Sequence, residues 1–165
     1  MFGCKKKITL QILAFLMVLF SASMASAATK VPDFILKSVP EKKEINIKDY
    51  RGKVVLVTFW ATWCGPCVQE IPSLKSLQDV YGPQGFSVLA ISMDQGGPRV
   101  VEKMMKRTNI NYPVVMGTSK VSKAFGGIFG IPTTFLIDQS GNVLKRYTGW
   151  VSHDVLETDI KKVVF

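Results

Sequence analysis

The sequence predicts an α/β protein, a three-layer α/β/α sandwich built around a mixed sheet. Two apolar strand patterns, 54–59 and 86–93, are each followed by a segment with helical spacing of apolar residues, which indicates parallel pairing. The turn sequence 139–142 then joins two further strand patterns, 133–138 and 143–147, and this predicts an antiparallel hairpin at one edge of the sheet.

The elements around the first buried strand follow from local patterns. Short apolar-alternating runs at 34–37 and 44–47 flank a polar turn, so we expect an N-terminal hairpin. A turn at 50–53 leads into strand 54–59. Apolar residues then recur with helical spacing over 67–81, and the glycine-containing segment 82–85 ends that helix.

One helix and one strand are expected after the second buried strand. Residues 98–108 have apolar side chains on one helical face, and 112–116 have the pattern of a short strand. A short helix over 120–125 ends at two glycines. The last helix begins at the capping residue Ser152 and runs to about 164. Tyr147 and Trp150, near the end of the last strand, are expected to pack into the domain; the alternative is a substrate-facing role.

The N-terminus has the pattern of a secretory signal peptide. Lys5–Lys7 form a positive region, 8–20 an apolar region, and 21–28 a run of small residues that contains Ala25-Ser26-Ala27. We therefore expect a signal peptide over 1–27 and a single domain over 28–165, periplasmic or otherwise extracytoplasmic. The alternative is an uncleaved segment that tethers the domain to the membrane.

The charge pattern indicates an ordinary solvated surface. The formal net charge is +9, and three of those positive charges belong to Lys5–Lys7. The remaining basic residues are scattered and show no interleaved aromatic platform, so we expect no nucleic-acid partner.

The most informative motif is Cys64-Gly65-Pro66-Cys67, which directly follows the first buried strand and opens a helix. A disulfide across so short a loop constrains little of the unfolded chain, so its expected use is redox chemistry rather than stabilisation. The helix N-terminus favours a thiolate at Cys64, and thiolates are the attacking species in disulfide exchange. Burial within the helix raises the expected pKa of the Cys67 thiol, which suits a resolving cysteine.

The remaining candidate ligands make a metal site a weaker interpretation. Beyond the motif the sequence has one cysteine, Cys4, and one histidine, His153. A structural zinc site needs four ligands, so we expect no metal and no cofactor. The alternative function is a copper-binding chaperone in which the two thiols act as soft ligands.

An ordered set of motifs resembles the thioredoxin superfamily and, within it, the extracytoplasmic TlpA/ResA/CcmG-like thiol–disulfide oxidoreductases. The resemblance covers nearly all of residues 32–163. It is carried by Pro32-Asp33-Phe34 with Leu36, Arg51-Gly52-Lys53-Val54-Val55-Leu56-Val57, Phe59-Trp60-Ala61-Thr62-Trp63-Cys64-Gly65-Pro66-Cys67, Glu70 with Pro72, and Gly130-Ile131-Pro132-Thr133-Thr134-Phe135-Leu136-Ile137-Asp138 with Gly141. It implies a thioredoxin-like form of the predicted sandwich, in which the helix and strand of about 98–116 are a central insertion, as in the TlpA/ResA-like branch.

The resemblance also assigns site residues. It implies an exposed Cys64 as nucleophile and a cis peptide bond at Pro132, with the Ile131 backbone free to pair with an extended substrate. The expected substrate-binding residues are Trp63, Gly65, Pro66, Ile131 and Pro132.

Glu70 is the third expected catalytic residue, as a proton relay to the cysteine pair. Thr58 stands where cytosolic thioredoxin has a buried aspartate, which leaves Glu70 the better candidate. The alternative is that Glu70 only compensates the helix dipole.

The function implied is reduction of disulfides in extracytoplasmic proteins, with cytochrome c maturation as one setting. The expected partners are a disulfide-containing substrate protein and a membrane donor of thiol reductant. The domain is expected to be a monomer.

Overall fold

The computed structural model describes residues 29–165. The expected signal peptide, 1–27, lies outside the described residues. The strands are β1 (Ile35–Val39), β2 (Glu44–Asn46), β3 (Val54–Trp60), β4 (Phe86–Ser92), β5 (Val114–Met116), β6 (Thr133–Ile137) and β7 (Val143–Thr148). The helices are α2 (Gly65–Tyr81), α3 (Pro98–Thr108), α4 (Ser119–Ala124) and α5 (His153–Val164), with 3₁₀ turns η1 (Ile47–Tyr50) and η2 (Gly82–Gln84).

All seven of these strands form one mixed sheet in the order β2-β1-β5-β4-β3-β6-β7. The pairs β3–β4 and β4–β5 are parallel, whereas β1–β2, β1–β5, β3–β6 and β6–β7 are antiparallel. The mixed sheet, the N-terminal hairpin and the central helix–strand insertion are therefore confirmed.

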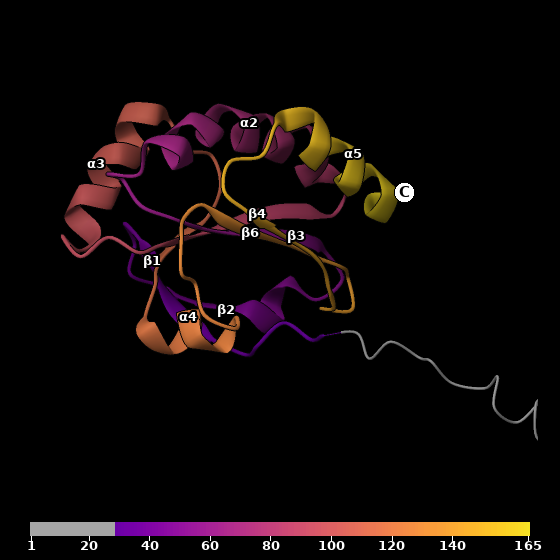
Figure 1. The fold of residues 1–165 in the computed structure, drawn as a ribbon, viewed down its shortest axis with the longest axis horizontal. Helices are drawn as coiled ribbons and strands as arrows, with labels where there is room; N and C mark the ends of the chain where they lie inside the picture. Colours follow the sequence, from indigo (N-terminus) through magenta and orange to yellow (C-terminus); the bar gives the residue numbers. More distant parts are fainter. Residues whose placement is uncertain (1–28) are drawn as a thin grey trace, which may run out of the picture.

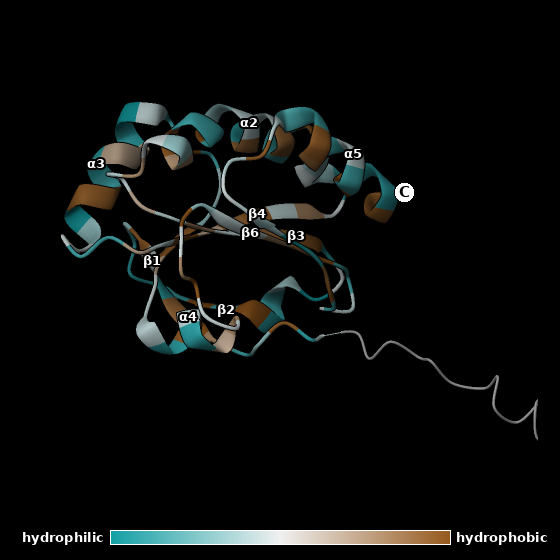
Figure 2. Ribbon diagram, in the orientation of Figure 1, coloured by the Kyte–Doolittle hydropathy of each residue, from teal (hydrophilic) through white to brown (hydrophobic). Residues whose placement is uncertain are grey.

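Helices cover both faces of the sheet and complete the three layers. In Figure 1, α2, α3 and α5 lie on one face, while α4 lies on the other. Figure 2 shows hydrophobic residues along the strands and alternating colours along the helices, as expected for elements that bury one side. Within residues 29–165, no helix is long and apolar enough to cross a membrane.

The register of the two central strands brings distant segments together. Strand β3 ends at Trp60, just before the cysteine motif, and β6 begins at Thr133, just after Pro132. Because β3 and β6 are antiparallel and Phe59 pairs with Thr133, the end of one strand lies beside the start of the other. The cysteine motif and Pro132 therefore meet at one end of the sheet.

Some boundaries differ from the sequence-based expectation. Helix α2 begins at Gly65 rather than at residue 67, because Cys64 acts as its N-cap residue. The second run of the hairpin ends at Asn46, whose side-chain oxygen accepts a hydrogen bond from the Lys48 N–H (3.0 Å) and starts η1. Strand β5 is shorter than expected and starts at Val114.

Candidate active site

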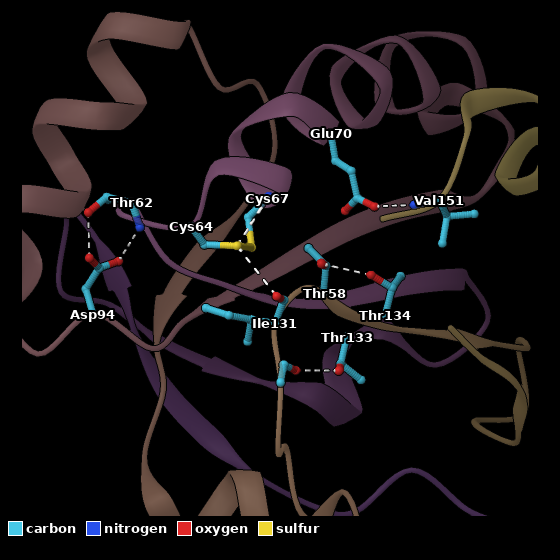
Figure 3. Close-up of a disulfide and its surroundings, with 11 residues drawn as sticks. Thr58, Thr62, Cys64, Cys67, Glu70, Asp94, Ile131, Thr133, Thr134 and Val151 are labelled. Atoms are coloured by element: carbon cyan, nitrogen blue, oxygen red, sulfur yellow. Dashed lines mark hydrogen bonds between the residues drawn. A yellow bond between two sulfur atoms is a disulfide. The ribbon is translucent and has the colours of Figure 1, made fainter. Parts of the chain in front are cut away.

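Cys64 and Cys67 form a disulfide at the N-terminal end of α2 (Figure 3). Their Cα atoms are 5.3 Å apart. Cys64 is still extended, and Gly65 and Pro66 form the first turn of the helix. Proline suits this position because the first N–H groups of a helix have no partner within it. The turn from β3 into α2 therefore brings the two sulfur atoms together.

The environment of the Cys64 sulfur is electropositive. The Cys67 N–H points at Cys64 Sγ at 3.3 Å, and the dipole of α2 adds partial positive charge. In the reduced protein both effects would lower the pKa of the Cys64 thiol. Cys67 is 2% exposed, and this burial would raise the pKa of its own thiol. The assignment of Cys64 as nucleophile stays a prediction with this physical basis.

The expected exposure of Cys64 is wrong for the disulfide form. Cys64 is only 6% exposed, because it packs into the cluster of buried side chains beneath α2. Its neighbours Trp63, Gly65 and Pro66 are exposed. A substrate would therefore first meet these three residues and the rim of the disulfide.

The loop before β6 lies directly against the disulfide. The Ile131 carbonyl oxygen is 3.7 Å from Cys64 Sγ, and the Ile131–Pro132 bond is cis, as the resemblance implies. Thr133 Oγ1 donates to the Gly130 carbonyl oxygen (2.7 Å), and the Gly149 N–H donates to the Pro132 carbonyl oxygen (2.8 Å). These bonds hold Ile131, which is partly exposed, beside Cys64.

Glu70 is buried one helical turn beyond Cys67. Its residue is 3% exposed, and Oε1 accepts a hydrogen bond from the Val151 N–H at 2.7 Å. Burial raises the pKa of Glu70 to about 7, although the Val151 hydrogen bond opposes the shift. The charge of Glu70 in turn adds to burial in raising the pKa of Tyr112. A carboxyl group with this pKa can both release and accept a proton near neutral pH.

Thr58 and Thr134 form a pair of buried hydroxyl groups on the neighbouring strands β3 and β6. Thr134 Oγ1 donates to Thr58 Oγ1 at 2.9 Å, and both residues are buried. Figure 3 shows this pair beneath Glu70, on the strands that carry the site. A hydroxyl pair of this kind satisfies its own polar atoms but has no acidic group that titrates near neutral pH.

A second carboxylate, Asp94, is a site residue that the sequence analysis missed. Asp94 Oδ2 accepts from the Thr62 N–H (3.0 Å) and from Ser92 Oγ (2.8 Å), and Oδ1 accepts from Thr62 Oγ1 (2.6 Å). The carboxylate thus ties the segment before Cys64 to the end of β4. Its sequence signal was an acidic residue just after a buried parallel strand adjacent to the cysteine-bearing strand.

The segment after β7 also differs from the expectation. Tyr147 is buried, as predicted, and its hydroxyl donates to Asp159 Oδ2 (2.8 Å). Trp150 is 55% exposed, so the prediction that it packs into the domain is wrong. The reason is the Gly149 turn, after which Val151 rather than Trp150 approaches α2.

Comparison with known proteins agrees with this geometry. Residues 26–164 match the model of the Redoxin family. The thiol-disulfide oxidoreductase ResA of Geobacillus thermodenitrificans is 36% identical over 140 residues, which are 84% of this chain and 78% of that protein. ResA of Bacillus subtilis is 31% identical over 131 residues, 79% of this chain and 72% of that protein.

A solved structure shows the same fold. A thiol:disulfide interchange protein of the thioredoxin family from Chlorobium tepidum superposes with a TM-score of 0.76 and 35% identity, and the match covers 85% of this chain and 99% of that one. Together with the Cys64–Cys67 disulfide, these matches settle the assignment. The chain belongs to the Redoxin family and, within the thioredoxin superfamily, to the TlpA/ResA-like thiol–disulfide oxidoreductases.

Proposed function

We propose that this protein reduces disulfides in other proteins outside the cytoplasm, using Cys64 and Cys67 as a dithiol. The observation that carries the proposal is the position of the pair: Cys64 Sγ lies at a helix N-terminus and beside the Ile131 carbonyl oxygen. The first feature activates a thiolate. The second offers backbone groups to an extended substrate segment, which can pair with Ile131 as an added strand.

The reaction proceeds in two exchanges. The Cys64 thiolate attacks one sulfur of the substrate disulfide, forms a mixed disulfide and releases the other substrate sulfur as a thiolate. Cys67 then loses its proton and attacks Cys64 Sγ, which restores the Cys64–Cys67 disulfide and releases the second substrate thiolate. Two electrons pass from the protein to the substrate, and both substrate thiolates take up protons.

Glu70 is the proposed acceptor of the Cys67 proton. It lies one turn beyond Cys67 on α2, and its pKa of about 7 lets a substantial fraction be ionised at neutral pH. The ionised carboxylate takes the proton before Cys67 attacks, and later passes it to water. A group that served only to compensate the helix dipole would have no such role in the rate.

The setting is proposed from the N-terminal pattern. Residues 1–27 act as a signal peptide cleaved after Ala27, or stay as a tether, and the domain works as a monomer on the far side of the membrane. A membrane thiol-reductant donor returns the disulfide to the dithiol form. Cytochrome c maturation, in which cysteine pairs of the apoprotein must be reduced, is the proposed physiological role.

Trapping tests this function directly. Cys67→Ala should leave the mixed disulfide unresolved, so partners accumulate on Cys64 and can be identified by mass spectrometry after purification under non-reducing conditions. The matched control is Cys64→Ala, which should trap far fewer partners. Equal trapping by the two variants would contradict the assignment of Cys64 as nucleophile.

The copper-chaperone alternative is tested by measuring how tightly the reduced protein binds Cu(I). Within residues 29–165, no group of three or more His, Cys, Asp and Glu side chains is placed to hold a metal ion. Competition of the reduced protein against a Cu(I) chelator should show only weak binding. Tight Cu(I) binding without disulfide reduction would favour the alternative.

A further inference from the structure

The end of the sheet opposite the disulfide carries a cluster of basic side chains. Arg51 and Lys53 lie just before the start of β3, and the turn 138–142 follows the end of β6. Because β3 and β6 are antiparallel, the start of one strand lies beside the end of the other. Lys30 forms a bridge with Asn142 of the same turn. The fold thus gathers basic residues that are scattered in the sequence, and we call Lys30, Arg51 and Lys53 the basic end.

Two of these three cations share one hydrogen-bond acceptor. Arg51 Nη1 donates to the Ser140 carbonyl oxygen at 2.8 Å, and Lys30 Nζ donates to the same oxygen at 3.1 Å. Gly141 leaves room for this arrangement, because a Cβ at that position would overlap the Arg51 guanidinium. A single neutral oxygen compensates two positive charges poorly, so both side chains can still bind an anion.

The carboxylates of this region leave the basic end positively charged. Within the part of the chain that the structure describes, no ion pair joins Lys30, Arg51 or Lys53 to an Asp or Glu. Asp49 precedes Arg51 by two positions, and the Asp138 carboxylate is hydrogen-bonded within its own turn. All three cations are exposed, so an anionic partner can reach them.

The basic end is also where the described part of the chain begins. The Thr29 carbonyl oxygen accepts from the Val143 N–H (2.8 Å), and Figure 1 shows this start on the side of the domain away from α3. The apolar region of the N-terminal pattern ends at Phe20, ten positions before Lys30. Ten residues span at most about 36 Å, so a membrane that holds this region lies within reach of the basic end.

We infer that the basic end docks on the anionic phospholipid surface of the membrane and turns the disulfide away from it. Strand β3 has seven residues and leads from the basic end to the cysteine motif, which places the disulfide about 20 Å from the docked end. The redox site then faces the aqueous side, where soluble substrate proteins approach. The nearby apolar region favours a lipid surface over an acidic protein as the partner. This inference goes beyond the proposed chemistry and rests only on the proposed setting at the membrane.

Lysine footprinting of the full chain tests the docking. The protein is placed in phosphatidylcholine vesicles with or without phosphatidylglycerol and acetylated with a membrane-impermeant reagent, and mass spectrometry gives the rate at each lysine. Lys120 of α4 is the internal reference. It lies toward the disulfide end, because α4 follows β5, and Met116 at the end of β5 pairs with Ser92, which itself pairs with Trp60.

The expected result is protection of the basic end on anionic vesicles alone. Each Lys or Arg near an anionic surface strengthens binding about fivefold, so three strengthen it about a hundredfold. Relative to Lys120, Lys30 and Lys53 should therefore react at least about fivefold more slowly on vesicles with phosphatidylglycerol than on those without it. An ionic strength of about 1 M should remove this protection by screening the charges. Inorganic phosphate at the same phosphate concentration, added to phosphatidylcholine vesicles, should give none.

Charge-reversal variants test whether the basic end itself makes the contact. Lys53→Glu should reduce the protection of Lys30 to about twofold or less. The matched control is Lys103→Glu, which makes the same charge change at an exposed position of α3 and should keep the wild-type protection. Arg51→Gln, which removes a charge instead of reversing one, is the second variant should Lys53→Glu fail to fold, and it should also weaken the protection of Lys30.

Three results would each overturn the inference: no protection of Lys30 and Lys53 on anionic vesicles, equal protection by inorganic phosphate, or equal effects of Lys53→Glu and Lys103→Glu. Lysine acetylation involves no disulfide exchange. Failure of the docking is therefore distinguishable from failure of the proposed function, which would appear as an absence of partners trapped by Cys67→Ala.

Discussion

Asp94 and Glu70 are two buried carboxyl groups on opposite sides of the disulfide, and their surroundings differ (Figure 3). Asp94 accepts hydrogen bonds from two groups of Thr62 and from Ser92. Within the described residues, Glu70 accepts one, from Val151. Three donors compensate a buried negative charge much better than one donor does.

The difference shows how one chemical group serves two purposes. Asp94 works as a fixed acceptor that holds the segment before Cys64 in place. Glu70 is left with its charge poorly compensated, so its pKa rises to about 7 and it becomes a proton carrier.

Removal of the Asp94 carboxylate should have the largest effect. Asp94→Ala leaves the donors of Thr62 and Ser92 without their acceptor, and we expect a loss of about 4 kcal/mol in the free energy of unfolding of the oxidised protein. Asp94→Asn keeps one acceptor oxygen and should lose about half as much. Urea unfolding of both variants measures this; a loss below about 1 kcal/mol in Asp94→Ala would show that Asp94 is not structural.

Glu70→Gln should instead raise the free energy of unfolding at neutral and alkaline pH. The wild-type pKa is raised from 4.5 to about 7 on folding, so the folded state binds the proton more tightly than the unfolded state. Stability associated with protonated Glu70 is therefore complete below about pH 4.5 and is lost as pH rises through about 7.

The expected size follows from the shift. Relative to Glu70→Gln, the wild type should lose up to about 3 kcal/mol of unfolding free energy between pH 4.5 and 8. Urea unfolding of the oxidised proteins across this range gives the difference. A constant difference between the two proteins over the whole range would mean that Glu70 has an ordinary pKa.

Thr62→Val should have the smallest effect of the three. It removes the hydroxyl donor to Asp94 Oδ1 but keeps the Thr62 N–H, and we expect a loss of about 1.5 kcal/mol for one hydrogen bond to a charged group. The matched control is Thr62→Ser, which keeps the hydroxyl and is measured in the same unfolding experiment. Similar losses in both variants would assign the effect to packing rather than to the hydrogen bond.

Local patterns were sufficient to predict most of the fold and the reactive pair. Apolar periodicity and turn residues located each strand and α-helix within residues 29–165, and Cys64 at a helix start needed no tertiary information. The cis bond at Pro132, which the structure has, was implied by the family resemblance and not by a local pattern.

Residues whose roles depend on long-range pairing were harder to predict. Asp94 acts on Thr62 only because β3 and β4 are neighbours in the sheet, and 32 positions separate the two residues. An aromatic residue near the end of a strand is expected to pack into the domain, as predicted for Trp150. No local pattern indicates that the turn at Gly149 directs Val151, and not Trp150, toward Glu70. The resemblance pointed to Glu70 as a site residue, but its burial and its hydrogen bond to Val151 depend on the folded structure and could not be predicted from the sequence.

The central claim, that Glu70 carries the proton that Cys67 loses, is tested most directly by the pH dependence of the resolving step. Single-turnover reduction of a peptide disulfide is followed in the wild type and in Glu70→Gln from about pH 5 to 9. The account predicts that the wild-type rate rises with an inflection near pH 7, where Glu70 becomes ionised, and that Glu70→Gln is slower and lacks this inflection. The same inflection and the same rate in both proteins would contradict it.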